Sequence, residues 1–217
     1  YHTLLAIFAF SLGISSFILA SKASSLRLTF TLTEKFTLLG RSLNVATFDL
    51  SMIGIFYLIA SLWILTSFFY YAEELFPTLT MVYTALLIAA ISIDPFLYSA
   101  LILFLANALF LPALSFGFYQ QISGRMRFLV FQLLSVVLIL LAGWILAGGE
   151  VAPVEEDQLF FSSVLLGCGL ALWLGVFPFY IWIPLLAEEV PFFPFGFMLS
   201  MLPLSGILML LKFLNNF

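Results

Sequence analysis

Seven long apolar runs constrain this chain more than any other feature of its sequence. They cover residues 3–20, 50–72, 75–93, 96–116, 128–148, 160–184 and 195–213. A helix needs about 20 apolar residues to cross the hydrocarbon core of a bilayer. It also pairs its backbone polar groups internally, which an irregular segment facing lipid cannot do. The runs therefore predict an all-α polytopic membrane protein with about seven to eight transmembrane helices.

Composition excludes several classes of function. Only 8% of the 217 residues are charged and the net charge is −4, which argues against nucleic-acid binding. The apolar runs fill most of the chain and leave no room for a soluble catalytic domain. One histidine, His2, and one cysteine, Cys168, cannot form a catalytic triad or a clustered metal site within this chain. We therefore expect no enzyme activity and no cofactor.

The segment 21–48 is the longest polar stretch and is predicted to lie outside the membrane. Within it, Leu26 to Thr33 reads LRLTFTLT, in which apolar and polar residues alternate and β-branched Thr is frequent. Gly40 and Asn44 then supply turn residues. This pattern predicts a short extramembrane β-hairpin. Because nothing in the sequence is typical of a flexible linker, residues 1–217 are assigned to a single transmembrane domain.

The distribution of basic residues leaves the orientation in the membrane open. Arg125 and Arg127 favour a cytoplasmic location for the loop 117–127. The basic segment 21–48, however, falls on the opposite side of the membrane when seven spans are counted. The rule that basic loops stay cytoplasmic therefore gives two conflicting answers.

Two prolines interrupt the apolar sequence between Leu172 and Pro191, which reads LWLGVFPFYIWIPLLAEEVP. Proline removes a backbone donor and its ring clashes with the preceding turn, so it breaks or kinks a helix. Pro178 and Pro184 therefore predict a broken helix in the region 172–195. Within a membrane, such a break is tolerated where protein surrounds it or where it lines a path.

This region resembles the antiporter-like membrane subunits of respiratory complex I, membrane-bound hydrogenases and Mrp-type cation/proton antiporters. Those subunits read K-x-A-x-x-P-F-H-x-W-L-P, followed by A-E-A-P-T-P. The matching positions here are Pro178, Phe179, Trp182, Pro184, Glu189 and Pro191. The resemblance covers Leu172 to Phe213, and extends more loosely to Asp94–Gly117 and to the entry at Gly40–Ser51. It implies a truncated, degenerate relative that keeps one of the family's two inverted repeats.

The resemblance also implies that the proton-carrying residues are lost. The family's pumping lysine falls on Trp173 and its histidine on Tyr180, while a glutamate five residues before a proline falls on Asn107. A second intramembrane lysine falls on Leu204 or its neighbour Pro203. Proton carriers need ionisable groups inside the bilayer. We therefore expect a subunit that does not pump, with Trp173 filling the space of the lysine.

Three charged residues remain as a possible residual relay: Glu188, Glu189 and Lys212. Glu189 matches an acidic position of the family pattern. The alternative is that both glutamates are solvated loop carboxylates, which is common for adjacent acids next to proline. Lys212, near the end of the last apolar run, has the alternative of extending its ammonium group to the lipid headgroups.

The leading hypothesis is an accessory or structural subunit of a multisubunit complex of the complex I, hydrogenase or Mrp kind. Its partners would be other membrane subunits and lipid. It would lie in a bacterial or archaeal cytoplasmic membrane or in an organellar energy-transducing membrane. Two alternatives remain open: an autonomous transporter or channel for a small solute or ion, and a membrane-embedded assembly protein without transport ancestry.

Overall fold

The computed structural model describes residues 2–26, 37–38, 41–43, 47–70, 74–94, 97–115, 123–147 and 156–216. Its internal contacts divide the chain into two compact units, Tyr1–Pro95 and Phe96–Phe217. Each unit is described by itself below. The assignment of 1–217 to a single transmembrane domain stays a prediction.

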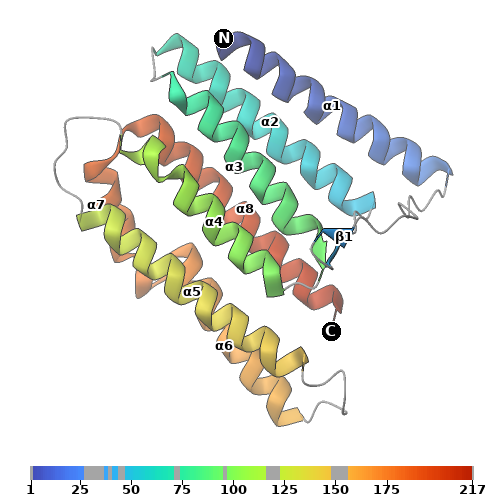
Figure 1. Ribbon diagram of the computed structural model, residues 1–217, viewed down its shortest axis with the longest axis vertical. Helices are drawn as coiled ribbons and strands as arrows, with labels where there is room; N and C mark the ends of the chain where they lie inside the picture. The colour runs from blue at the N-terminus through green and yellow to red at the C-terminus, as the bar shows by residue number, and fades with distance from the viewer. Residues whose placement is uncertain are drawn as a thin grey trace. The chain divides into compact units, whose positions relative to one another are not determined.

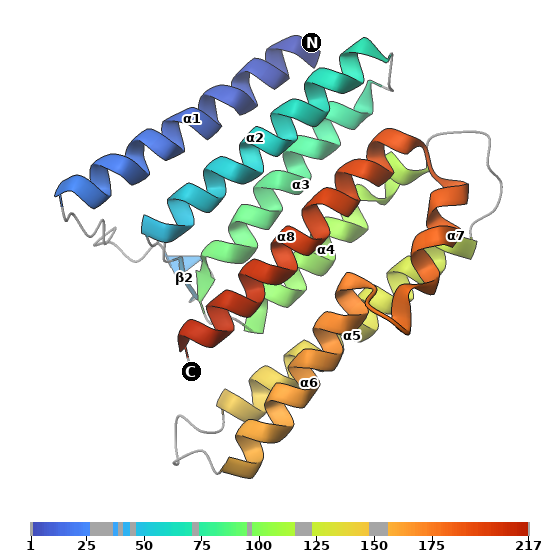
Figure 2. The same ribbon diagram turned by 180° about the vertical axis from the view of Figure 1, so that it is seen from behind.

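The first unit contains three long helices, α1 (His2–Leu26), α2 (Thr47–Phe69) and α3 (Leu75–Ser92). They lie side by side with α2 in the middle (Figure 1 and Figure 2). The buried face of α1 consists of small residues at helical spacing, Ala6, Ala9, Gly13 and Ser16. Small side chains let two helix backbones approach closely, which is how helices associate in lipid. The large apolar side chains of α1, such as Leu4 and Ile7, are exposed.

Three short strands also belong to the first unit: β1 (Thr37–Leu38), β2 (Arg41–Leu43) and β3 (Ile93–Asp94). They form antiparallel pairs in the order β1-β2-β3. The strand predicted at 26–33 lies outside the described residues, except for Leu26, which ends α1. The hairpin expected over 21–48 therefore stays a prediction.

The second unit is arranged around α5 (Ser123–Ala147). This helix contacts α4 (Leu97–Leu114), α6 (Glu156–Leu174) and α7 (Trp182–Glu189). The last helix, α8 (Phe192–Asn216), contacts α4, α6 and α7. Aromatic side chains fill the space between these helices. The Phe110 and Phe197 rings are 5.3 Å apart between α4 and α8, and the Phe128 and Trp182 rings are 5.0 Å apart between α5 and α7.

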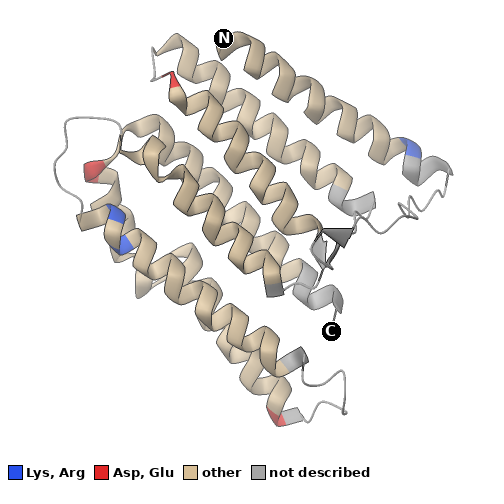
Figure 3. Cartoon of the chain, viewed as in Figure 1, with Lys and Arg blue, Asp and Glu red and all other residues tan. Residues whose placement is uncertain are grey.

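Six apolar segments in the described part of the chain are long enough to cross a membrane. They are His2–Lys22, Leu50–Phe69, Leu75–Ser92, Ser123–Ile145, Asp157–Glu189 and Phe192–Leu211, and a shorter apolar helix covers Tyr98–Leu114. By length and composition, these helices identify an integral membrane protein. The charged side chains that the structure describes lie at or near helix ends (Figure 3). Charged residues at the ends of apolar helices are typical of membrane proteins.

The apolar run 160–184 is interrupted within the region 172–195, where a broken helix was predicted: α6 ends at Leu174, and a 3-10 turn, η2 (Phe179–Ile181), precedes α7. One boundary differs from the expectation, because α5 begins at Ser123 rather than at 128. The two arginines at the start of α5 end the apolar run but not the helix. The first turn of α5 is stabilised by Glu189, from a distant part of the chain.

Candidate functional site

The chain turns sharply where α6 ends, and a glycine makes this turn possible. Gly175 has a φ of +64°, a left-handed conformation that costs other residues about 1 to 2 kcal/mol. The Val176 N–H donates to the Ala171 carbonyl at 2.9 Å and the Gly175 N–H donates to the Leu172 carbonyl at 3.3 Å. This pair of hydrogen bonds is the Schellman arrangement that ends many helices.

The two prolines lie on either side of this turn in different roles. Pro178 follows the end of α6 by four positions and is exposed. Pro184 is exposed in the first turn of α7, where the missing backbone N–H would have had no helical partner. The break was predicted to lie at these prolines. In the structure, the conformation that ends α6 belongs to Gly175, and Pro178 prevents the helix from resuming at once.

Three buried polar groups join α4, α5 and α6 just before the turn. The Asn107 Nδ2 amide donates to Gln132 Oε1 at 3.1 Å, and the Gln132 Nε2 amide donates to the Trp173 backbone carbonyl at 3.1 Å. We call these groups the polar cluster. Asn107 and Trp173 are each 1% exposed and Gln132 is 0% exposed. The Trp173 carbonyl lies in the last turn of α6, where helical carbonyls lack an N–H partner, and Gln132 supplies one.

Most of the buried hydroxyls described in the two units do not extend this cluster. Ser61 and Ser67, for example, donate to carbonyls of their own helix at 2.8 and 2.7 Å. This back-bonding satisfies a hydroxyl locally. Ser135 is different, because its Oγ donates across the helix interface to the Gly169 carbonyl at 2.6 Å. Ser135 therefore clamps α5 to α6 beside the polar cluster.

One face of α5 contacts the chain on both sides of the turn. Gly124, Phe128, Gln132 and Ser135 follow one another at helical spacing, all are buried, and we call them the α5 stripe. Ser135 and Gln132 bind α6, and Phe128 packs on Trp182 of α7. A Cβ atom at Gly124 would lie 2.7 Å from the Leu185 carbonyl oxygen of α7, so only glycine fits there. The α5 stripe thus packs against both α6 and α7, on the two sides of the turn.

The carboxylate of Glu189, at the end of α7, binds the first turn of α5. Its Oε1 accepts from the Ser123 hydroxyl at 2.6 Å, and its Oε2 accepts from the Gly124 N–H at 2.8 Å and from the Arg125 N–H at 3.4 Å. The first N–H groups of a helix lack helical partners and carry a partial positive charge. Glu189 is only 5% exposed. It is therefore a buried anion that caps the N-terminus of α5.

The two tryptophans that flank the turn, Trp173 and Trp182, each bury an indole N–H. Trp173 is 1% exposed and Trp182 is 0% exposed. The indole N–H of each has no hydrogen-bond acceptor among the residues that the structure describes. A buried donor without an acceptor costs about 1 to 3 kcal/mol. The packed form around the turn therefore carries an energetic penalty that its other contacts must offset.

The remaining predicted site residues whose side chains the structure describes do not join the polar cluster. Tyr180 is in η2 and is 49% exposed, with its ring stacked on Phe177 at 6.3 Å. Leu204 is half-buried in α8 and has an aliphatic side chain. Glu188 is exposed, unlike its neighbour Glu189. Lys212 lies on α8, but its side chain is outside the described part of the structure.

Sequence reasoning missed the central role of Gln132 and of the start of α5. Gln132 is the only glutamine within the apolar run 128–148, and a lone amide in a membrane helix indicates a hydrogen bond between helices. That signal was available. The pairing of Glu189 with Ser123 and Gly124 joins residues more than 60 positions apart, and no local pattern predicts it.

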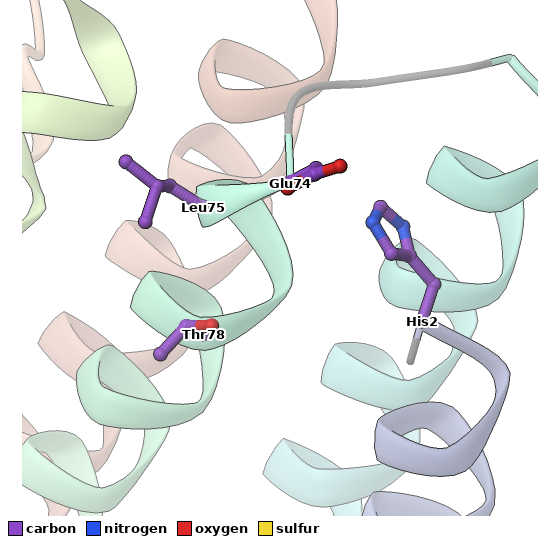
Figure 4. Close-up of a pocket in the computed structure, with 4 residues that line it drawn as sticks. All are labelled: His2, Glu74, Leu75 and Thr78. Atoms are coloured by element: carbon purple, nitrogen blue, oxygen red, sulfur yellow. The ribbon is translucent and has the colours of Figure 1, made fainter.

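A separate pocket lies in the first unit, near the start of α1. It has a volume of about 400 Å³ and is lined by His2, Glu74, Leu75 and Thr78. Figure 4 shows His2 of α1 on one side and the other three residues, at the start of α3, on the opposite side. Zinc sites use three or four protein ligands. No group of three His, Cys, Asp or Glu side chains that could hold a metal ion occurs among the described residues.

Comparisons with known proteins leave the site to be interpreted from its own geometry. No protein-family model matches the chain, and no curated protein or solved structure matches it.

Proposed function

We propose that this chain is an antiporter-like, non-pumping accessory subunit of a multisubunit membrane complex of the complex I, hydrogenase or Mrp kind. The observation that carries the proposal is the polar cluster. Two of the positions that the resemblance assigns to proton carriers, Asn107 and Trp173, are linked there through Gln132, Asn107 by its side-chain amide and Trp173 by its backbone carbonyl. They come from different helices and are far apart in the sequence. The proximity of Asn107 to the end of α6 that carries Trp173 supports a common ancestral site.

The chemistry of the cluster favours a role without proton transfer. Asn107, Gln132 and Trp173 are neutral at every physiological pH. Buried amides that satisfy one another stabilise a packed interface, whereas a proton carrier must change its charge. The Trp173 side chain is fully buried and adjoins Gly206 of α8, since a Cβ atom at Gly206 would lie 3.5 Å from Trp173 Cδ1. A large, buried, uncharged side chain at this position would exclude water from the former path.

Several finer features belong to the same proposal. The chain would cross the membrane about seven to eight times. The region 172–195 would contain the break of one membrane span that consists of α6, η2 and α7, and the segment 21–48 would contain a hairpin outside the bilayer. The host membrane would be a bacterial or archaeal cytoplasmic membrane or an organellar energy-transducing membrane. The exposed apolar faces, for example that of α1, would contact lipid and neighbouring subunits.

The first experiment is purification of the tagged chain in a mild detergent, with mass spectrometry of every protein that stays bound. We expect stoichiometric recovery of antiporter-like, quinone-reductase or hydrogenase subunits. Recovery of the chain alone, monodisperse and stable, would contradict the subunit proposal. That result would favour an autonomous transporter or channel, and substrate screening would be the next step. Recovery with unrelated, substoichiometric partners would favour an assembly protein.

A further inference from the structure

We infer that α7 is a gate over the polar cluster, hinged at Gly175 and Val190 and held closed by Glu189. The inference goes beyond the proposed subunit role and does not depend on it. It rests on how α7 is attached to the rest of the second unit: a left-handed glycine and a 3-10 turn precede it, an extended valine follows it, and one buried carboxylate binds it to α5.

The two ends of α7 have the backbone of hinges. On one side, the chain between Leu174 and Trp182 contains a left-handed residue, Gly175, and a single 3-10 turn. Most side chains of this linker are exposed, including Phe177 at 80%. On the other side, Val190 is extended, with φ of −122° and ψ of 143°, before α8 begins at Phe192. Helix-terminal and loop residues of this kind absorb the backbone rotation when a segment opens.

Glu189 is the latch, because it makes the charged contact between α7 and α5. Three donors on the first turn of α5 converge on its carboxylate, from Ser123, Gly124 and Arg125. Hydrogen bonds to a charged group are roughly twice as strong as those between neutral groups. The adjacent Glu188 is exposed and has no described hydrogen bond to α5. The two neighbouring glutamates therefore differ in the contact that would hold the gate closed.

Opening would uncover the path to the polar cluster along the α5 stripe. Trp182 of α7 covers Phe128, with ring centroids 5.0 Å apart, and Phe128 lies one helical turn before Gln132. The closed form also leaves the Trp182 indole N–H buried without a described acceptor, a group that water would satisfy after opening. In the closed form, the Trp182 N–H without a described acceptor favours opening, and the charged contact of Glu189 opposes it. Opposed contributions of this kind allow two states.

The test measures how fast a cysteine on the buried face of α7 reacts with N-ethylmaleimide in the full chain. Leu186 is 0% exposed in α7, so Leu186→Cys reports opening, and Ala142, 1% exposed on α5, gives a control as Ala142→Cys. Both are placed in a Cys168→Ser background, because the native Cys168 is exposed. Each reporter is combined with Glu189→Ala, Glu189→Gln or Glu188→Ala.

We expect Glu189→Ala to accelerate labelling at Leu186→Cys about tenfold, since lost charged hydrogen bonds of this kind shift an equilibrium by about that factor. Glu189→Gln should give an intermediate rate, and Glu188→Ala and the Ala142→Cys reporter should not change. Equal rates for Glu188→Ala and Glu189→Ala would overturn the gate. Equal acceleration at both reporters would also overturn it, because that result shows a general loosening of the unit.

A second measurement keeps the test valid if Leu186→Cys does not fold. The backbone N–H groups of Gly124 and Arg125 donate hydrogen bonds to Glu189 in the closed form. Their hydrogen exchange can be followed without a cysteine. We expect faster exchange of these amides and of α7 in Glu189→Ala, with α6 unchanged. Unchanged exchange in α7 would overturn the inference, because the lost acceptor by itself accelerates exchange at Gly124 and Arg125.

Discussion

Gln132 and Trp173 are joined by a hydrogen bond that ties the middle of α5 to the last turn of α6. The Gln132 side-chain amide donates to the Trp173 backbone carbonyl at 3.1 Å, and the same side chain accepts from Asn107 of α4 at 3.1 Å. The Gln132 side chain therefore links α5 to both α4 and α6. Because all three groups are buried, removal of the glutamine takes one buried hydrogen bond from each of its two partners.

The first prediction concerns this glutamine. Gln132→Leu should destabilise the chain by about 1 to 3 kcal/mol, because the Asn107 amide and the Trp173 carbonyl lose their common partner. Asn107→Leu removes only one link, so it should cost less. In the double variant the two effects should not add, since both changes act on one network. Unfolding in mixed micelles measures each free energy. Strict additivity of the two changes would show that the residues are not coupled.

The second prediction concerns the turn that ends α6. Gly175→Ala should destabilise the chain by about 1 to 3 kcal/mol, because alanine is unfavourable at positive φ and a Cβ atom there would lie 2.9 Å from Ile183 Cδ1. Gly167→Ala is the matched control within α6, since a Cβ atom at Gly167 would meet nothing within 4 Å. Thermal unfolding in detergent compares the two. Equal stability of both variants would contradict a special role for Gly175.

The sequence predicted the helices well and the contacts between them poorly, for a physical reason. Apolar length alone locates a membrane helix, so runs such as 50–72 and 195–213 match α2 and α8 within a few residues. The end of α6 depends on the φ of one glycine, which hydropathy does not report. The sequence drew attention to the prolines because proline breaks helices in any context. Glycine ends them only where a turn forms.

The assignment of Asn107 and Trp173 as former proton-path positions stays a prediction. The resemblance singled out these two residues, and the structure joins the Asn107 side chain through Gln132 to the Trp173 backbone carbonyl. It gave no role to Gln132, which joins them, because an amide in an apolar run has many possible partners. For Glu189 the sequence left two interpretations open, a relay or a solvated carboxylate. The structure shows a buried cap on α5, which depends on a contact between distant segments.

The third prediction tests how closely α7 approaches α5. Gly124→Ala should destabilise the chain by about 1 to 3 kcal/mol, because its Cβ atom would lie 2.7 Å from the backbone carbonyl oxygen of Leu185, which cannot rotate away. The strain should displace α7, so Glu189→Ala should cost less in the Gly124→Ala background than in the native chain. A Glu189→Ala effect of the same size in both backgrounds, measured by unfolding in micelles, would contradict this coupling.

The last prediction tests whether Trp173 blocks a former proton path. Trp173→Lys alone should be poorly folded, since an unpaired charge buried in the membrane costs about 2.5 kcal/mol or more. Asn107→Glu together with Trp173→Lys introduces one negative and one positive charge on the two helices that Gln132 joins, α4 and α6, so the double variant should recover more folded protein than Trp173→Lys alone. We expect this double variant to increase proton leak in liposomes, measured with a pH-sensitive dye. The control, Asn107→Gln with Trp173→Phe, keeps both positions uncharged and should not leak. A folded double variant that leaks no more than this control would remove the support for Trp173 as a plug.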